Sequence, residues 1–200
     1  MMIIDIETTG VSPIKTCIVE LASIKIEKPK VFYQKLCRID PGDIIESQAL
    51  EINGQSIEGA RDLRRITQKE MLIDFFSWAD KQGDFFIAGH NIGSFDLNFL
   101  KTKSEKYGLK FPFQLRVLDL HTLAQFKHFQ INGKFLTDNG KSLMDLPAVL
   151  KFVGMTDNRN KHNALEDCKL EAEAFSRLLS SRGLFKEYAA FEIPGYLKKD

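Results

Sequence analysis

The chain has 200 residues, of which 44% are hydrophobic and 28% are charged, a composition typical of one globular domain with a sizeable core. Its formal net charge of +1 excludes binding to nucleic acid through a large basic face, because that mode needs many side chains that neutralise phosphates. A nucleic-acid end held in a pocket is still compatible with this charge.

The cysteines and the N-terminal segment bear on the compartment of the protein. Three cysteines, Cys17, Cys37 and Cys168, are too few for a disulfide framework, and their spacing does not match a zinc site. The chain opens with a strand-like segment and has no long apolar run, so we expect neither a signal peptide nor a membrane span. A reduced, cytoplasmic protein without a membrane partner is therefore expected.

Strands are expected first along the chain, over residues 1–7, 17–27 and 30–40. They follow one another through short connections, so at least one neighbouring pair is expected to be antiparallel and the sheet to be mixed. A short helix is expected over 47–53, ended by Gly54.

The middle of the chain is expected to hold two longer helices with a strand between them. A capping box opens the first helix, over 67–82, whose apolar residues recur at helical spacing. A short buried strand is expected over 85–91. Ser94 is then expected to cap a helix that reaches Tyr107.

The second half of the chain is expected to begin with a strand that turns helical within 116–126. In the polar region 129–141, the segment FQINGKFL favours a small hairpin at its Asn-Gly pair. Two further helices are expected, over 142–153, where Pro147 delays or kinks the helix, and over 164–180. Strands with helices between and after them predict an α/β layer fold.

Two acidic residues lie in the first expected strand. Asp5 and Glu7 alternate with Ile4 and Ile6, so the period of two places both carboxylates on one face, roughly 7 Å apart. An edge strand with one solvated face is the plain alternative, which the neighbouring isoleucines disfavour.

Further acids lie on the apolar faces of two expected helices. Asp96 falls in the middle of an apolar arc, although an acid in the first turn is also favoured by the helix dipole, and the pattern does not decide between these interpretations. Asp167 and Glu171 both fall within the apolar arc of the last helix, and the helical wheel does not say which of them is functional.

Four carboxylates from three segments are therefore expected to face the interior. Buried like charges are costly, and Lys103 is the one basic residue expected near them, so divalent cations would compensate them better. An all-carboxylate set suits Mg²⁺ or Mn²⁺, and two such ions about 4 Å apart drive in-line phosphoryl transfer.

Three segments resemble the exonuclease motifs of the DEDD superfamily, in its histidine-containing branch: DIETTG (5–10), HNIGSFD (90–96) and HNALEDC (162–168). That branch includes the proofreading epsilon subunit of bacterial DNA polymerase III, ribonuclease T and the three-prime repair exonucleases. QALEINGQS (48–56) resembles the family segment beside the terminal nucleotide. VLDL (117–120) resembles the family's Asp-Thr strand, with leucine in place of the usual threonine.

The resemblance implies a ribonuclease H-like fold with a mixed five-stranded sheet flanked by helices, and 3′→5′ hydrolysis of DNA or RNA ends to nucleoside 5′-monophosphates. It implies a general base, His162, and two divalent ions, Mg²⁺ or Mn²⁺. The implied metal ligands are Asp5, Glu7, Asp96 and Asp167. The implied substrate contacts come from the main chain at Thr8 and Thr9 and from Ala49, Ile52, Asn53 and Asn91.

The positions of two histidines in the sequence indicate their roles independently of the resemblance. His162 precedes the last helix in a polar stretch, and histidine titrates near neutral pH, which suits a general base, although a lone loop histidine is usually a plain surface residue. His90, at the end of a buried strand, is expected to be structural.

The resemblance predicts an exonuclease domain over 1–183 and a tail over 184–200 that packs on the domain or contacts a partner. The expected substrate is a single-stranded or frayed 3′ end. A non-catalytic module that binds 3′ ends or docks a partner on the same fold is the alternative, disfavoured because no ligand is lost. DNA or RNA preference and a protein partner or homodimer are left open.

Overall fold

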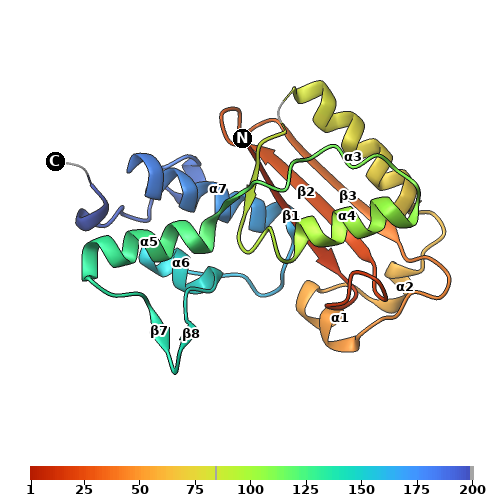
Figure 1. Ribbon diagram of the computed structural model, residues 1–200, viewed down its shortest axis with the longest axis horizontal. Coiled ribbons are helices and arrows are strands. Elements are labelled where there is room, and N and C mark those ends of the chain that lie inside the picture. The colour runs from red at the N-terminus through yellow and green to blue at the C-terminus, as the bar shows by residue number, and fades with distance from the viewer. Residues whose placement is uncertain (84, 199–200) are drawn as a thin grey trace.

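A six-stranded mixed sheet forms the centre of the computed structural model, which describes residues 1–83 and 85–198 (Figure 1). The strand order is β4-β3-β2-β1-β5-β6. The strands are β1 Met2–Thr8, β2 Ile18–Lys25, β3 Phe32–Arg38, β4 Ile66–Thr67, β5 Ile87–Gly89 and β6 Leu118–Asp119.

The first three strands form an antiparallel meander, and the others join it in parallel. β1 pairs with β2 and β2 with β3 antiparallel, whereas β5 pairs with β1, β6 with β5 and β4 with β3 parallel. The predicted mixed α/β sheet of ribonuclease H-like type is therefore confirmed. The sheet has six strands rather than five, because two residues before helix α3 pair with the outer edge of β3.

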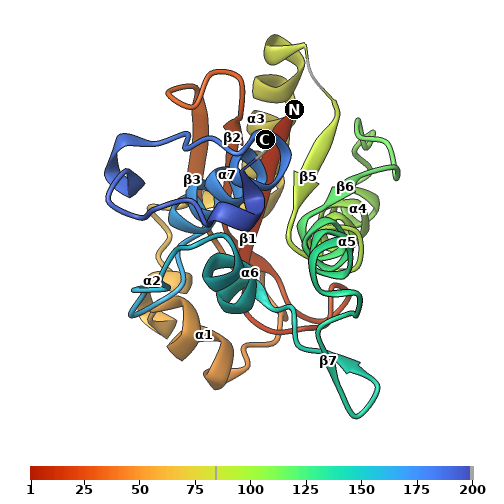
Figure 2. The ribbon, with the colours of Figure 1, turned by 90° about the vertical axis from the view of Figure 1, so that its left-hand side faces the viewer.

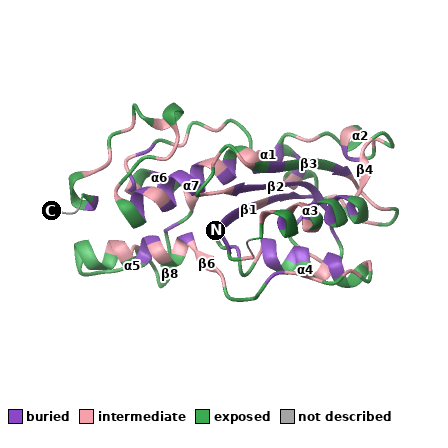
Figure 3. Ribbon diagram, turned by 90° about the horizontal axis from the view of Figure 1, so that it is seen from above, coloured by how far each residue is buried: buried purple, intermediate pink, exposed green. Residues whose placement is uncertain are grey.

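Helices cover both faces of the sheet. Apolar residues of α3 and α4 pack against one face together with Met2, Ile4 and Ile6, and those of α5, α6 and α7 pack against the other face together with Ile3. Figure 3 shows the buried residues concentrated in the central strands and along α7. The helices are α1 Ser47–Asn53, α2 Ile57–Ala60, α3 Gln68–Gln82, α4 Asp96–Lys106, α5 Leu120–Asn132, α6 Leu146–Phe152 and α7 Ala164–Ser180, with short 3₁₀ turns η1 Lys186–Tyr188 and η2 Gly195–Leu197.

Glycine at position 89 allows β5 to lie close against β1. A Cβ atom on Gly89 would be 2.9 Å from the carbonyl oxygen of Ile4, which is closer than real Cβ contacts. A side chain here would push the end of β5 away from β1. The residues that follow β5 are thereby held next to the acidic residues of β1.

Helix α4 begins later than predicted. Its first residue is Asp96, and the Ser94 hydroxyl donates to the carbonyl oxygen of Asn91 instead of capping the helix. Asn91 has a φ of 56°, so the chain turns sharply between β5 and α4. Ser94, predicted to cap the helix, therefore stabilises the turn that precedes it.

The two Asn-Gly pairs have different roles from those predicted. Gly133 adopts the left-handed conformation that ends α5, so the first pair is a helix terminus. Asn139 and Gly140, with φ of 46° and 74°, form the two-residue turn between β7 Thr137–Asp138 and β8 Lys141–Ser142. The hairpin predicted over 129–136 is therefore wrong, because residues 129–132 belong to α5, and the hairpin that the structure contains turns at the second pair.

Helix α6 also starts later than predicted. Ser142 belongs to β8, and the helix is capped by Asp145, whose carboxylate accepts the N–H of Ala148, with Pro147 in the first turn. The predicted delay by proline is therefore correct, and the predicted start is wrong by four residues.

The last described residues, 184–198, pack against α7. Leu197 is buried in the same core as α5, α6 and α7. The Arg177 guanidinium pairs with Glu173 and also donates to the carbonyl oxygen of Tyr188, while Glu173 accepts the N–H groups of Leu184 and Phe185. Within residues 1–83 and 85–198, no helix is long and apolar enough to cross a membrane.

Candidate active site

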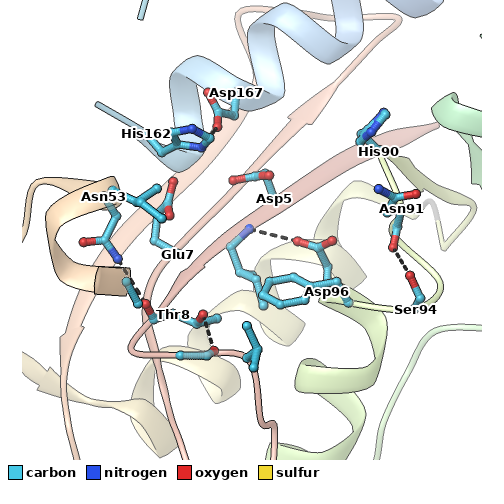
Figure 4. Close-up of a pocket in the computed structure, with 16 residues that line it drawn as sticks. Asp5, Glu7, Thr8, Asn53, His90, Asn91, Ser94, Asp96, His162 and Asp167 are labelled. Carbon is cyan, nitrogen blue, oxygen red and sulfur yellow. Dashed lines mark hydrogen bonds and ion pairs between the residues drawn. The ribbon is translucent and has the colours of Figure 1, made fainter. Parts of the chain in front are cut away.

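A cavity of about 460 Å³ opens beside the C-terminal end of β1 (Figure 4). Its walls come from β1, α1, the β5–α4 turn and the start of α7. The residues that line it are Asp5, Ile6, Glu7, Thr8, Gly10, Val11, Ala49, Ile52, Asn53, His90, Asn91, Ser94, Phe95, Asp96, His162 and Asp167.

Two acids reach this cavity from β1. Because side chains alternate along a strand, Asp5 and Glu7 share the face on which Ile3 packs with the α7 core, while Ile4 and Ile6 face α3 and α4. The strand therefore buries its isoleucines and aims both carboxylates toward α7, as the alternation predicted.

Asp96 reaches the cavity from the first turn of α4. β5 ends at Gly89, so the N–H of Ile6 has no strand partner on that side, and the Asp96 carboxylate accepts it at 3.1 Å. The side chain is 4% exposed. The apolar arc around Asp96 thus reflects a buried acid with a defined partner rather than a solvated helix terminus.

Asp167 lies in the first turn of α7 and has two basic neighbours. Its Oδ1 accepts a hydrogen bond from Arg159 at 2.7 Å, and its Oδ2 lies 3.2 Å from Nδ1 of His162. Asn163 caps the helix by accepting the N–H of Glu166. The segment before α7 therefore brings both His162 and a guanidinium to one carboxylate.

The prediction that Lys103 lies near the acids was wrong. Lys103 instead donates to the carbonyl oxygen of Thr16, whereas the Arg159 guanidinium bonds to Asp167. Arg159 also binds Asp157 through two nitrogens. In the sequence, the spacing of Asp157 and Arg159 indicates that these two residues can pair. No local pattern indicates the contact between Arg159 and Asp167.

The carboxylates perturb one another strongly. Burial, together with the charges of Asp96, Glu171 and other acids, raises the pKa of Asp5 well above its ordinary value. Burial and the neighbouring Asp167 raise the pKa of Glu7 to about 9, and burial raises the pKa of Asp96 to about 7. Without a bound cation, the cluster therefore resists full ionisation at neutral pH.

Glu171 lies one turn beyond Asp167 and is 2% exposed. One of its carboxylate oxygens accepts the N–H of His90 at 3.2 Å, and the other has no hydrogen-bond partner among the described residues. Asp167 lines the cavity and Glu171 does not. Of the two acids that the helical wheel left open, position in the cavity therefore favours Asp167.

Most of the implied substrate contacts also line the cavity. Ala49, Ile52 and Asn53 reach it from α1, and the Asn53 amide donates to the carbonyl oxygen of Thr8 at 3.1 Å. The N–H of His162 donates to the carbonyl oxygen of Ile52 at 2.9 Å. Helix α1 is therefore tied both to β1 and to the segment that carries the histidine.

Thr9 is not brought to the cavity, contrary to the expectation. It is fully buried, and its N–H donates to Cys17 while its carbonyl oxygen accepts from Glu46. Its hydroxyl donates to the carbonyl oxygen of Ile44. Thr9 therefore supports the turn after β1, and Thr8 and Asn91 remain as the main-chain and side-chain candidates.

His90, the residue directly after β5, lines the cavity. Burial lowers the pKa of His90 to about 4, so this histidine is neutral at physiological pH. Its ring meets that of His121 edge-on, at 6.1 Å between centroids. A structural histidine was expected here, and its position in the cavity wall was not.

The donor set fits hard divalent cations. Donor atoms of Glu7, His162 and Asp167 lie within 4.8 Å of one another, and the carboxylates of Asp5 and Asp96 line the same cavity. Burial and the neighbouring carboxylates raise the pKa values of Asp5 and Glu7, and the positive charge of Arg159, which bonds to Asp167, offsets this only in part at Glu7. Oxygen-rich, crowded carboxylates of this kind are typical of sites for Mg²⁺ or Mn²⁺.

Comparison with known proteins points to one family. The RNase_T family model, described as "Exonuclease", matches residues 2–175. A PolC-type DNA polymerase III of Listeria monocytogenes is 26% identical over 196 residues, which cover 88% of this chain and 13% of the polymerase. The PolC-type enzyme of Pediococcus pentosaceus is 30% identical over 132 residues, 66% of this chain and 9% of the polymerase. The chain thus spans a small part of these relatives.

Solved structures share the fold. The nuclease domain of 3′hExo, a DEDDh family member bound to rAMP, has a TM-score of 0.70 at 17% identity and covers 92% of this chain and 94% of its own. E. coli exonuclease I in complex with a dA16 oligonucleotide has a TM-score of 0.69 at 18% identity, covering 90% of this chain and 40% of that enzyme. The solved structures show that the fold is shared, and the family model over residues 2–175 shows that the chain belongs to the exonuclease family.

Proposed function

We propose that this chain hydrolyses single-stranded or frayed nucleic acid from its 3′ end and releases nucleoside 5′-monophosphates. The observation that carries this proposal is the convergence of four carboxylates, from β1, α4 and α7, with His162 in one cavity. Neutral overall charge agrees with a site that grips a strand end rather than a long duplex.

Asp5, Glu7, Asp96 and Asp167 would hold two divalent ions, Mg²⁺ or Mn²⁺. When bound, the ions would supply charge neutralisation at the scissile phosphate and a more acidic water. The chain's own contribution is to keep four carboxylates crowded together, at a cost that the packing of β1, α4 and α7 offsets. Cation binding should therefore stabilise the folded protein.

His162 would act as the general base. Its Nδ1 faces Asp167, which leaves Nε2 to take the proton from the attacking water, while the carboxylate orients the ring and stabilises the imidazolium. The side chain is 46% exposed, so it is accessible to water and to substrate. The hydrogen bond from its N–H to Ile52 fixes the main chain from which it extends.

The terminal nucleotide would lie between α1 and β1. Main chain at Thr8 would meet the 3′-hydroxyl, Ala49, Ile52 and Asn53 would contact base and sugar, and Asn91 would help to position the scissile nucleotide. Val11 and Phe95 line the same cavity and offer apolar surface for stacking. The bound rAMP of 3′hExo and the dA16 of exonuclease I agree with a nucleic-acid ligand for this fold.

The alternative is a module that binds 3′ ends, or docks a partner, without cleaving. It has the weaker support, because all four acids and the histidine line one cavity. A partner such as a polymerase, or a second copy of this chain, would then be the functional ligand. The two proposals differ in product, since only the exonuclease releases mononucleotides.

Direction of cleavage tests the proposal. Oligonucleotides labelled at the 5′ end are incubated with Mg²⁺ or Mn²⁺, carrying a 3′-hydroxyl, a 3′-phosphate or a blocked 5′ end. We expect progressive shortening from the 3′-hydroxyl end, resistance of the 3′-phosphate, and no effect of the 5′ block. Cleavage of a circular single strand would instead identify an endonuclease on this fold.

A further inference from the structure

Helix α5 and the hairpin β7–β8 form a projection that the proposed chemistry does not use. Residues 126–143, from the second half of α5 to the end of the hairpin, are called the arm below. In Figures 1 and 2 the hairpin extends from the fold on the same side as α1. That helix forms part of the cavity wall, so the arm and the cavity share one side of the molecule.

The hairpin is fixed to α5 by specific contacts. The Gln125 side chain donates to the carbonyl oxygen of Leu136 at 2.9 Å and accepts the N–H of Leu136 at 3.0 Å. The rings of Phe129 and Phe135 pack at 4.8 Å between centroids, and His128 contacts the carbonyl oxygen of Lys134. The arm is therefore a built feature with a defined orientation.

The base of the arm is connected to the cavity by two histidines. His90 lines the cavity, and His121 packs edge-on against it. The other side of His121 bonds to the hydroxyl of Ser142 in β8 at 2.8 Å. The arm thus begins one side chain away from the cavity wall.

The exposed surface of the arm combines aromatic rings with lysines. Phe126, Phe129 and Phe135 are 55%, 44% and 54% exposed. The arm contains three lysines, at positions 127, 134 and 141, and one acid, Asp138. It is therefore more basic than the whole chain, whose net charge is +1. Rings that can stack on bases, interspersed with cations that can meet phosphates, are typical of surfaces that bind single-stranded nucleic acid.

We propose that the arm binds the single strand on the 5′ side of the scissile nucleotide. The proposal rests on the proposed exonuclease function and adds to it a second contact site outside the cavity. The lysines would neutralise backbone phosphates, and the outer faces of Phe129 and Phe135 would stack on bases. A protein-docking surface is disfavoured, because the lysines lie among the rings and the arm is contiguous with the cavity wall.

The test compares a long and a minimal substrate. The minimal substrate is the p-nitrophenyl ester of thymidine 5′-monophosphate, which fills the cavity but cannot reach the arm, and the long one is single-stranded oligothymidylate. The arm variant is K134E/K141E, and its control is K69E/K81E on α3, which lies at the far end of the molecule from the hairpin (Figure 1). Both variants change the net charge equally, and ester turnover reports that each variant is folded.

For the arm variant we expect kcat/KM on oligothymidylate to fall about 25-fold at 0.1 M salt, because each lost phosphate contact removes about 0.7 from the slope of log affinity against log salt. The salt slope should decrease by about 1.4, and ester turnover should stay at the wild-type value. The control should match wild type on both substrates. Phe135→Leu should lower kcat/KM on oligothymidylate at least about fivefold, whereas Phe32→Leu on β3 should not.

Failure of the arm proposal can be distinguished from failure of the exonuclease proposal. If wild type turns over neither substrate, the exonuclease proposal and the arm proposal both fall. If wild type turns over both, and the arm variant equals the control with an unchanged salt slope, the arm proposal alone is wrong.

Discussion

At the scale of single residues, the crowded acids make stability depend on pH. Glu7 and Asp96 have folded-state pKa values of about 9 and about 7, above the values of about 4 that apply in an unfolded chain. Between these limits the folded protein binds more protons than the unfolded one, so the free energy of unfolding decreases as pH rises. In EDTA we expect the melting temperature to fall from about pH 5 to about pH 9.

Asp96→Asn tests the assignment of this pH dependence. The variant has no carboxylate to titrate there, so the part of the fall below about pH 7 should shrink, while the part due to Glu7 at higher pH should persist. Thermal melts across the pH range, in EDTA, measure both parts. A melting temperature that is constant or rises across this range in the wild type would contradict the described electrostatics.

His162 is expected to affect turnover but not cation binding. A general base of this kind contributes about 10²–10⁴-fold to the rate, so His162→Ala should lose activity in that range. The increase in melting temperature with Mn²⁺ should be retained, because the four carboxylates are intact. Single-turnover assays and thermal melts measure the two effects. Turnover near the wild-type rate would remove His162 from the mechanism.

At the scale of elements, the first turn of α7 holds Asp167 in place. Asn163 caps this helix through the N–H of Glu166, and its amide also donates to Glu20 at 2.9 Å. Asn163→Ala should cost about 1 kcal/mol of stability and should also lower activity, because the turn that carries Asp167 loosens. Asp145→Ala removes the corresponding cap of α6, a helix that does not line the cavity. It should cost a similar stability without loss of activity, and equal activity losses in the two variants would contradict this role.

The elements also show how much of the fold the sequence could predict. Helix α7 was predicted at both ends, 164 and 180, because a long apolar stripe and strong termini agree there. Helix α3 was predicted for the same reason, whereas for β1 to β3 the strands were predicted with only one antiparallel pair required among them, and the structure has two. The two Asn-Gly pairs were confused because left-handed residues end a helix and form a hairpin turn equally well. Strand β4, with two residues, is too short to leave a pattern.

The residues of the candidate site were predictable where short sequence motifs contain them. Asp5, Glu7, Asp96 and Asp167 all line one cavity, as the motifs implied. Arg159 and the position of Glu171 were not predictable, because both depend on contacts between segments. The roles of these residues are still proposals, which the experiments above address.

In the whole molecule, the site lies at the C-terminal end of β1, an interior strand whose two faces are covered by the two cores. β1 buries apolar residues on one face and gathers carboxylates on the other, next to α7 (Figures 3 and 4). The arm adds an exposed surface on the same side of the molecule as the cavity wall. A net charge of +1 gives little long-range attraction for nucleic acid, so local contacts must provide binding.

We propose that the four carboxylates support cation-dependent release of nucleotides from 3′ ends. The most direct measurement is the release of 5′-mononucleotides from an oligonucleotide by wild type and by Asp5→Ala, with Mg²⁺, Mn²⁺ or EDTA, combined with melts of the same samples. We expect release only by wild type with a divalent ion, together with an ion-dependent rise in melting temperature that Asp5→Ala largely loses. Mononucleotide release in EDTA, or equal release by Asp5→Ala, would contradict the claim.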